Sequence, residues 1–588
     1  MARKSPRQRV KIGSTVAVDN PLLRLSLSTG RQRIVLVVVG LAFAVLAGRA
    51  IQLQLFKTKD LQRVGERSYT QTVSLAASRG KILDRHDTVL ASSLPARAIY
   101  VDPQRFIKAS HQQVEVLAGK LGMSSQSIRR RVQKGGRKFA YLKRQVSVDS
   151  AEQIEALDIP GVAAQSEYKR HYPEGMIAAH VVGFTDYDDI GKEGVEHASD
   201  LRLAGRPGSR RVIRDRFGRV LDDLNTDVAP IHGEDEQLAI DSRLQYLAFN
   251  ALRETVAEHK AKAGAAIALD VRSGEILALA NWPSYDPNDR SGVTMDAVRN
   301  RVVYDSFEPG STMKPFTVAL ALELRKVTPN TIIETAPGKL KIGPDTIGDS
   351  HFLGALSVSE VIEKSSNVAI AKMALDMEAQ QLWQFFSELG FGLPPGAGFP
   401  GAAAGRLRPH RSWRPIEQAT MAYGHGLSVT LLQLAHAYMI FARDGNMPPV
   451  DIRLRHGTTP GRQIISEATA KSIRSMLELA VGSGGTASKA QVVGYRVAGK
   501  TGTSLKQEKG KYVKKYVSSF VGFVPASDPR ILIAVMIDEP TGKFFYAGDV
   551  AAPLFSRIAA HALRQLRIAP DAAVAEIQVP GRDEVARK

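Results

Sequence analysis

The sequence predicts an α/β protein in which one transmembrane helix precedes an elongated mixed α+β domain and a larger domain whose antiparallel sheet is covered by helices. Three observations lead to this fold class. A long apolar run begins at Ile34, and short strand-like runs broken by turn residues follow from about residue 70 to 105. Farther on, a hairpin precedes a series of helical segments, strands return after them, and no βαβ repeats occur.

Length and composition support a folded, multidomain chain. At 588 residues it is too long for one ordinary core, and 44% hydrophobic with 23% charged residues excludes disorder for most of the length. The absence of cysteine excludes disulfides, thiolate metal sites and cysteine nucleophiles. A formal charge of +20 suggests anionic partners, among them nucleic acid, phospholipid headgroups or acidic wall polymer.

The apolar run Ile34–Gly48 covers about 22 Å as a helix, and its extension to Leu55 covers about 33 Å, enough to cross a membrane. Eight basic residues and one acid precede it, so the positive-inside rule places 1–33 in the cytoplasm as a basic tail and the chain after 56 outside. A cleaved signal peptide is the alternative. We favour the anchor, because Gly48-Arg49-Ala50 is a poor cleavage site.

Residues 56–235 are predicted to form a pedestal or docking domain. Strands are expected between residues 70 and 105, and a short helix is expected over 111–122. The segment 129–144 has eight basic residues and no acid; we interpret it as a solvated helical face, although a glycan or partner site is the alternative. Extended connections and hairpins are expected from Gly191 to Gly233.

Residues 236–568 are predicted to form the larger domain. Its first helix is expected within Leu238–Glu258, and the hairpin joins the runs Ala265–Val271 and Glu275–Ala280. Further strands are predicted at Val492–Thr503 and Ser518–Asp538. An amphipathic helix at Pro553–Leu566 should cover the sheet, and residues 569–588 should form a mobile tail.

Ser311 is the leading candidate nucleophile. It follows Pro309-Gly310 and opens a nearly continuous apolar run, so it should lie at the start of a buried helix with Lys314 one turn away on the same face. The helix dipole favours a developing oxyanion there, and a lysine kept neutral by burial could accept the serine proton. Ser78 with Lys81, and Ser166 with Lys169, have the same spacing but no following helix.

Two further motifs single out the first pair. The Ser365-Ser366-Asn367 segment could relay protons and hold a substrate amide, although alone it could be a helix cap. Lys500-Thr501-Gly502-Thr503 ends a strand-like run, where Gly502 would admit a ligand backbone and the threonine hydroxyls could bind a carboxylate. Alone, this segment could be a polar strand end. The three motifs in this order are typical of penicillin-binding proteins and class A β-lactamases.

The sequence resembles the class B penicillin-binding proteins, in particular their division-specific peptidoglycan D,D-transpeptidases, from about Ile34 to Phe555. The segments that carry the resemblance are RGKILDR at 79–85, YPEG at 172–175, AAHVVGF at 178–184, EPGSTMKP at 308–315, WRPIEQAT at 413–420, YGHGLSVT at 423–430 and AGKTGT at 498–503.

The resemblance implies a role for each motif. Ser311 would attack the penultimate D-alanine carbonyl of a stem peptide, with Lys314 as base and with Ser365 and Lys500 in the proton network. The other implied contacts are to substrate: Asn367 to the peptide, Thr501 and Thr503 to its terminal carboxylate, and the backbone N–H groups of Ser311 and Thr503 to the oxyanion.

The resemblance also implies partners and location. The substrates would be peptidoglycan stem peptides, β-lactams would be inhibitors, and a septal glycosyltransferase and other division proteins would be partners. The chain would cross the inner membrane once, with its N-terminus cytoplasmic and its catalytic domain periplasmic. We expect no cofactor and no metal, because the thirteen histidines are scattered without a ligand pattern.

Two departures from the family pattern are expected to alter loop shape without loss of activity. Phe545–Gly548 (FYAG) occupies the place of a Tyr-Gly-Gly run, and His425 is an unusual middle residue in a Gly-x-Gly turn. Neither lies in the three motifs.

Three other functions are less consistent with the sequence. A β-lactamase would need a Glu-x-x-Leu-Asn segment between Ser365 and Lys500, and the sequence has none. A non-catalytic adaptor would tolerate degraded motifs, and these are intact. Nucleic-acid binding has no motif in the cytoplasmic segment of about 33 residues, so the basic charge is assigned to the membrane and wall.

Overall fold

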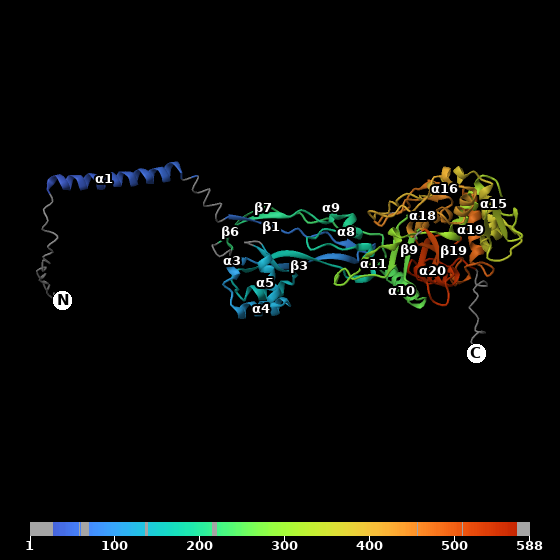
Figure 1. Ribbon diagram of the computed structural model, residues 1–588, viewed down its shortest axis with the longest axis horizontal. Helices are drawn as coiled ribbons and strands as arrows, with labels where there is room; N and C mark the ends of the chain where they lie inside the picture. The colour runs from blue at the N-terminus through green and yellow to red at the C-terminus, as the bar shows by residue number, and fades with distance from the viewer. Residues whose placement is uncertain are drawn as a thin grey trace, which may run out of the picture. The chain divides into compact units, whose positions relative to one another are not determined.

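The computed structural model describes residues 28–57, 59, 70–135, 139–214, 220–455, 457–508 and 510–572. The chain divides into two compact units. One comprises residues up to 73 together with 210–227, and the other comprises 74–209 and the chain from 228 onward. Their elements are coloured along the chain in Figure 1. Most of the predicted basic tail and of the predicted C-terminal tail lies outside the described residues.

The first unit begins with helix α1 (Thr29–Ile51), which continues as the π-helical turn η2 (Gln52–Phe56). Its apolar side chains are exposed, and among the described residues it is the one helix long and apolar enough to cross a membrane. This confirms the predicted helix, which starts five residues earlier than expected. The unit also holds most of a three-stranded sheet with the order β1 (Thr70–Leu75), β6 (Gly208–Arg214), β7 (Val220–Val228).

The second unit opens with a mixed sheet and helices on it. The sheet has the order β4 (Ala140–Val146), β3 (Val89–Val101), β2 (Ile82–Leu83), β8 (Glu236–Gln237), and β5 (Val162–His171) pairs with β3. A small core joins it to the helices α3 (Pro103–Phe106), α4 (His111–Leu121), α5 (Ser125–Lys134) and α6 (Val148–Glu155). The strands predicted before residue 105 and the helix predicted at 111–122 are therefore confirmed.

The basic segment 129–144 is not one helical face, which corrects that prediction. Its first part belongs to α5 and its last part to strand β4, because Gly135 ends the helix. Several of its cations also have partners: Lys143 donates to the Leu121 carbonyl at 2.7 Å, and Arg144 pairs with Glu167 at 3.0 Å. The cluster is thus partly structural.

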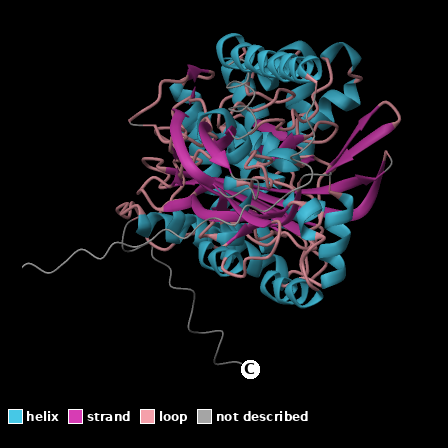
Figure 2. Cartoon of the chain, turned by 90° about the vertical axis from the view of Figure 1, so that its left-hand side faces the viewer, coloured by secondary structure: helices cyan, strands magenta, loops and turns pink. Residues whose placement is uncertain are grey.

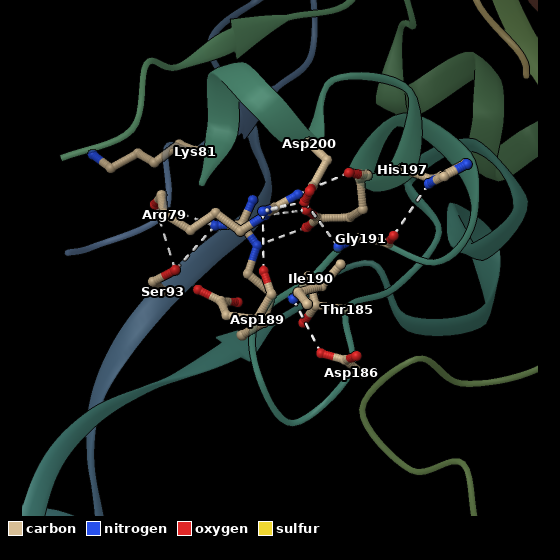
Figure 3. Close-up of polar contacts among 12 residues, drawn as sticks. Arg79, Lys81, Ser93, Thr185, Asp186, Asp189, Ile190, Gly191, His197 and Asp200 are labelled. Carbon is tan, nitrogen blue, oxygen red and sulfur yellow. Dashed lines mark hydrogen bonds and ion pairs between the residues drawn. The ribbon is translucent and has the colours of Figure 1, made fainter. Parts of the chain in front are cut away.

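A buried ion cluster links the strands to the short helices α8 (Gly194–Ala198) and α9 (Asp200–Leu203), in a stretch where extended connections and hairpins were expected. Arg79 and Arg170 each contact the fully buried Glu196 at 2.6 Å. Arg79 also reaches Asp200 at 2.8 Å (Figure 3). Helix α8 thus places the carboxylate of Glu196 between two guanidinium groups.

The larger sheet has five antiparallel strands in the order β10-β9-β21-β20-β19. Their bounds are β9 Ala263–Asp270, β10 Ile276–Trp282, β19 Ala498–Glu508, β20 Lys511–Val524 and β21 Ile531–Asp538. The predicted hairpin is confirmed. Strand β19 starts six residues later than predicted, and the predicted last strand is two strands, because a turn at Pro525–Arg530 separates them.

Helices cover both faces of this sheet (Figure 2). Alternate residues of β9 and β21 separate the two cores: Ala266 and Ile533 face one core, and Ile267 and Ala534 face the other. The first core is completed by α10 (Ser242–Glu258) and α20 (Ala547–Gln565), and the second by α13 (Lys314–Glu323), α18 (Leu431–Ala442), α19 (Glu467–Val481) and neighbouring helices.

Helix α20 begins at Ala547, six residues before the predicted start at Pro553. A proline near the first turn is a strong local signal for a helix start, but here it lies inside the helix. Val550 and Ala551, which precede it, are fully buried. Their packing on the sheet offsets the hydrogen bond that Pro553 cannot make.

Candidate active site

Ser311 lies in a short 3₁₀ turn, η4 (Gly310–Met313), that leads directly into α13. The backbone N–H of Gly310 donates to the Gly424 carbonyl at 3.0 Å, and a Cβ at Gly424 would lie 2.1 Å from the Gly310 oxygen. This close backbone approach holds the turn from behind. Ser311 itself stays partly exposed at the start of an otherwise buried helix, as predicted.

Lys314 and Lys500 converge on the hydroxyl of Ser365. The Nζ of Lys314 lies 3.0 Å from Ser365 Oγ and 2.5 Å from the Ser365 carbonyl oxygen. The Nζ of Lys500 lies 3.0 Å from the same Oγ. Both lysines are fully buried. The structure therefore joins residues of three separate sequence motifs through one hydroxyl.

Burial changes the protonation of both amines. It is the main cause that holds the pKa of Lys314 well below its usual range; the charge of Lys500 acts in the same direction, and the carboxylate of Asp349 acts against it. Burial lowers the pKa of Lys500 to about 7. Because the pKa of Lys314 lies well below its usual range, this amine can act as a base near neutral pH.

Ser365 lies between helix α14 (Val358–Lys364) and helix α15 (Asn367–Leu375) in the left-handed backbone region, with φ 63°. Few residues other than glycine adopt this conformation. Next to it, Ser366 caps α15, and its Oγ accepts a hydrogen bond from the Ala369 N–H at 3.1 Å. The amide of Asn367 donates to the Gly348 carbonyl at 3.0 Å. The motif thus caps a helix and also supplies the hydroxyl that contacts both buried amines.

The Lys500–Thr503 segment lies on β19, at the edge of the sheet and against η4. A Cβ at Gly502 would lie 2.5 Å from the Pro309 carbonyl oxygen. The glycine is therefore required for the Ser311 turn to pack on the strand, a different reason from the ligand approach that the sequence suggested. Thr503 Oγ1 accepts from the Ala547 N–H at 3.0 Å.

Sequence reasoning missed two polar residues of this region. Thr486 Oγ1 lies 3.0 Å from Thr501 Oγ1 and 3.5 Å from the Nζ of Lys500. Asp349 accepts hydrogen bonds from the residues that follow Ser365. A glycine-rich stretch before Thr486 was a weak signal for that residue. Asp349 had no signal, because its partners lie too far along the chain for a local sequence pattern to connect them.

The two rival Ser-x-x-Lys pairs lie elsewhere in the second unit. Ser166 and Lys169 are exposed on strand β5, where residues three apart point to opposite faces. Ser78 precedes the buried Arg79, and Lys81 is exposed before β2. Neither pair has the helix start that Ser311 has.

His425 contacts the segment that precedes Ser311. Its Nδ1 lies 3.0 Å from the carboxylate of Glu308, three residues before Ser311. The hydroxyl of Tyr512, on β20, donates to the same carboxylate at 3.0 Å. The other departure, Phe545, stacks on Tyr516 with ring centroids 4.2 Å apart. Both departures thus contact strand β20.

A cleft of about 950 Å³, bordered mainly by polar and charged residues, lies away from these motifs. It is bordered by the turn around His86 and by the start of α10, with Ser242 and Tyr246 in its wall. Within the described ranges, no group of three or more His, Cys, Asp or Glu side chains is arranged to hold a metal ion. The motifs themselves supply hydroxyl groups, amines and backbone dipoles.

Two family models match the chain. The penicillin-binding protein transpeptidase domain matches residues 264–560, and the penicillin-binding protein dimerisation domain matches residues 74–238. The first match contains all of the motif residues described above. The second contains the mixed sheet and the buried ion cluster.

Similar proteins have related names. The probable peptidoglycan D,D-transpeptidase PenA of Neisseria meningitidis (strain Z2491) is 40% identical over 547 residues, 92% of this chain and 94% of its own. The peptidoglycan D,D-transpeptidase FtsI of Escherichia coli K12 is 38% identical over 539 residues, covering 90% and 91%. A solved transpeptidase domain of Burkholderia pseudomallei penicillin-binding protein 3 is 46% identical, covers 57% of this chain and 98% of its own, and has a TM-score of 0.53.

Proposed function

The chain belongs to the class B penicillin-binding proteins of the division-specific D,D-transpeptidase type, and on this premise we propose that Ser311 forms the acyl-enzyme through which it cross-links peptidoglycan stem peptides at the septum. The observation that carries the assignment is the convergence of Lys314 and Lys500 on one hydroxyl, that of Ser365, in a pocket that depresses the pKa of both amines.

In the acylation step, Ser311 Oγ attacks the carbonyl carbon of the penultimate D-alanine, and neutral Lys314 takes the hydroxyl proton. The tetrahedral oxyanion is stabilised by the backbone N–H groups of Ser311 and Thr503. The C–N bond then breaks. The proton passes through Ser365, with Lys500 as its charged neighbour, to the nitrogen of the departing D-alanine.

In the second step the amine of another stem peptide attacks the ester carbonyl of Ser311. Lys314 removes a proton from this amine, the new amide forms, and the serine oxygen leaves and recovers a proton. The enzyme is regenerated, and two stems are joined by one peptide bond. When the serine attacks the carbonyl of a β-lactam, the ring C–N bond breaks and an analogous ester forms on Ser311; this ester blocks the nucleophile, so β-lactams are inhibitors of this reaction.

Substrate binding is assigned to β19 and to Asn367. Because β19 is an edge strand, an extended peptide can pair with its free backbone groups. Thr501 and Thr503 hold the terminal carboxylate, and Lys500 adds positive charge. Asn367 binds the peptide amide, and Gly502 keeps the strand against the Ser311 turn.

The remaining assignments concern organisation. Among the described residues one helix is long and apolar enough to cross a membrane, and together with the FtsI-type relatives it supports a single-pass membrane protein. We assign 1–33 to the cytoplasm, 34–55 to the inner membrane, 56–235 to a periplasmic docking domain, 236–568 to the periplasmic transpeptidase domain and 569–588 to a tail. The positive charge before the helix supports this orientation. A septal glycosyltransferase and other division proteins are the proposed partners.

A labelling experiment tests the proposal. The purified full chain in detergent is incubated with a fluorescent penicillin, and the adduct is located by mass spectrometry. We expect one adduct, on Ser311, which disappears in Ser311→Ala. Normal labelling of that variant, or an adduct on Ser78 or Ser166, would overturn the assignment.

A further inference from the structure

Asp349 lies outside the three motifs, in the loop that follows strand β14 (Asp345–Gly348), yet it accepts two hydrogen bonds from the second motif and one from the residue after it. Its Oδ2 accepts from the hydroxyl of Ser366 at 2.7 Å. Its Oδ1 accepts from the backbone N–H of Asn367 at 2.5 Å and from that of Val368 at 3.1 Å. One carboxylate therefore binds three consecutive residues of this segment.

These contacts begin one residue after Ser365. Ser365 has a left-handed backbone conformation, and that conformation directs both its carbonyl and its hydroxyl oxygen to Lys314. A serine in this region needs its neighbours held in place. Asp349 fixes the residues on one side of the turn, and helix α14 fixes those on the other.

Asp349 also acts electrostatically on Lys314. The charged groups that act on this amine are Lys500, which disfavours its protonation, and Asp349, which favours it. Asp349 thus partly offsets the burial and repulsion that neutralise Lys314. Asp349 therefore affects the same proton network in two ways, through its charge and through its hydrogen bonds. Substitutions that remove one and keep the other can distinguish the two effects.

We infer that Asp349 is a positioning residue of the acylation reaction, holding the Ser365–Asn367 turn in register with Lys314. The inference rests on the proposed role of Ser311. It concerns a residue that does not touch the substrate but acts through Ser366, Asn367 and the field at Lys314.

Asp349→Asn is the informative variant. The side-chain oxygen can still accept from the two backbone N–H groups, while the charge and the acceptor for the Ser366 hydroxyl are lost. We expect the second-order rate of acylation by a fluorescent penicillin to fall about 10-fold. We also expect the acid limb of its pH profile to move to lower pH, because removal of the negative charge lowers the pKa of Lys314 further.

Two further variants complete the test. Asp349→Glu keeps the charge, so its pH profile should stay close to that of the wild type even if its rate falls. Asp345→Asn, an exposed carboxylate four residues earlier, is the matched control and should change neither rate nor profile. Melting temperatures of all three variants report whether the fold is intact.

The outcomes separate this inference from the proposed function. If the wild type is labelled at Ser311 but Asp349→Asn reacts at the wild-type rate with an unshifted profile, the positioning role is wrong and the nucleophile assignment stands. If Asp349→Asn has a lower melting temperature and a slower rate but an unshifted pH profile, Asp349 only caps the helix. That result would also overturn the inference. An unlabelled wild type would contradict the proposed function itself.

Discussion

The Nζ of Lys500 donates a hydrogen bond of 3.0 Å to the hydroxyl of Ser365, across 135 residues of sequence. A strand edge and a turn between two helices are joined by this contact, and Lys314 reaches the same hydroxyl from a third element. Ser365 is therefore the only side chain of the described site that contacts both buried amines. Its hydroxyl can accept from one amine while it donates to the other.

Ser365→Ala removes this shared hydroxyl without removing either amine. We expect acylation by a fluorescent penicillin to slow by about 100-fold, within the range that proton-transfer groups contribute. Thr486→Ala is the matched control. It removes a hydroxyl that lies 3.5 Å from Lys500 but makes no contact to Lys314, so its effect should be several-fold smaller. Equal losses in the two variants would contradict a special role for Ser365.

Stability should depend on pH through Lys500. Its pKa is about 7 in the folded chain and about 10.5 when exposed, so between these values the unfolded state binds a proton that the folded state does not. Unfolding therefore becomes harder as pH rises through this window, by about 1.4 kcal/mol per pH unit at most. The melting temperature of the wild type minus that of Lys500→Met should rise from pH 7 to pH 10. A flat difference would show that Lys500 remains charged when buried.

Local sequence patterns predicted most of the site. Ser311 at a helix start, Ser365 in a helical region and Lys500 on a strand were all placed on the right kind of element, because a proline-glycine break, an apolar run and a strand-like run are local signals. The order of the motifs then made their spatial convergence expected. Long-range partners could not be predicted in this way.

The errors have a common physical cause. Pro553 is a strong local signal for a helix start, but packing on the sheet extends helix α20 before it. Taken alone, the basic segment 129–144 suggests a solvated face. In the structure, Arg144 pairs with carboxylates on strands and loops that are distant in sequence. Asp349 and Thr486 lack a local signal altogether. In each case a tertiary contact determined the local structure or the side-chain partner, and the neighbouring residues in the sequence do not reveal that contact.

Gly502→Ala tests the contact between β19 and the Ser311 turn. The added Cβ would lie 2.5 Å from the Pro309 oxygen and 2.9 Å from Thr312 Cγ2, so strand and turn must separate. We expect a loss of about 1–3 kcal/mol in unfolding free energy and a larger proportional loss of acylation rate. Gly396→Ala is the control, since nothing lies within 4 Å of its Cβ position. Wild-type acylation in Gly502→Ala would refute this account.

Glu196→Gln tests the buried ion cluster. The substitution leaves Arg79 and Arg170 buried beside a neutral group, and uncompensated buried charge typically costs about 3–5 kcal/mol. We expect a large fall in melting temperature. The control is Glu254→Gln, which breaks the exposed pair with Arg557 and should change stability by less than about 1 kcal/mol. Similar melting temperatures for the two variants would mean that the cluster does not stabilise the fold.

Tyr512→Phe tests the link between β20 and the segment before Ser311. Tyr512 donates to Glu308 at 3.0 Å, and the same carboxylate contacts His425 and the Gly426 N–H, so the hydroxyl helps to hold three segments together. We expect acylation to slow by about 3- to 10-fold, the equivalent of one hydrogen bond to a charged group, with an unchanged melting temperature because Tyr512 is half-exposed.

A double variant distinguishes an effect through the carboxylate from an effect of the tyrosine itself. Glu308→Gln should slow acylation too, and the double variant should be little slower than Glu308→Gln alone, because Tyr512 acts through this carboxylate. Tyr516→Phe, on the same strand, is the control for loss of a hydroxyl. Additive losses in the double variant would show that Tyr512 contacts the substrate directly. In that case His425, which shares the same carboxylate, would have to be tested as a separate contributor to acylation.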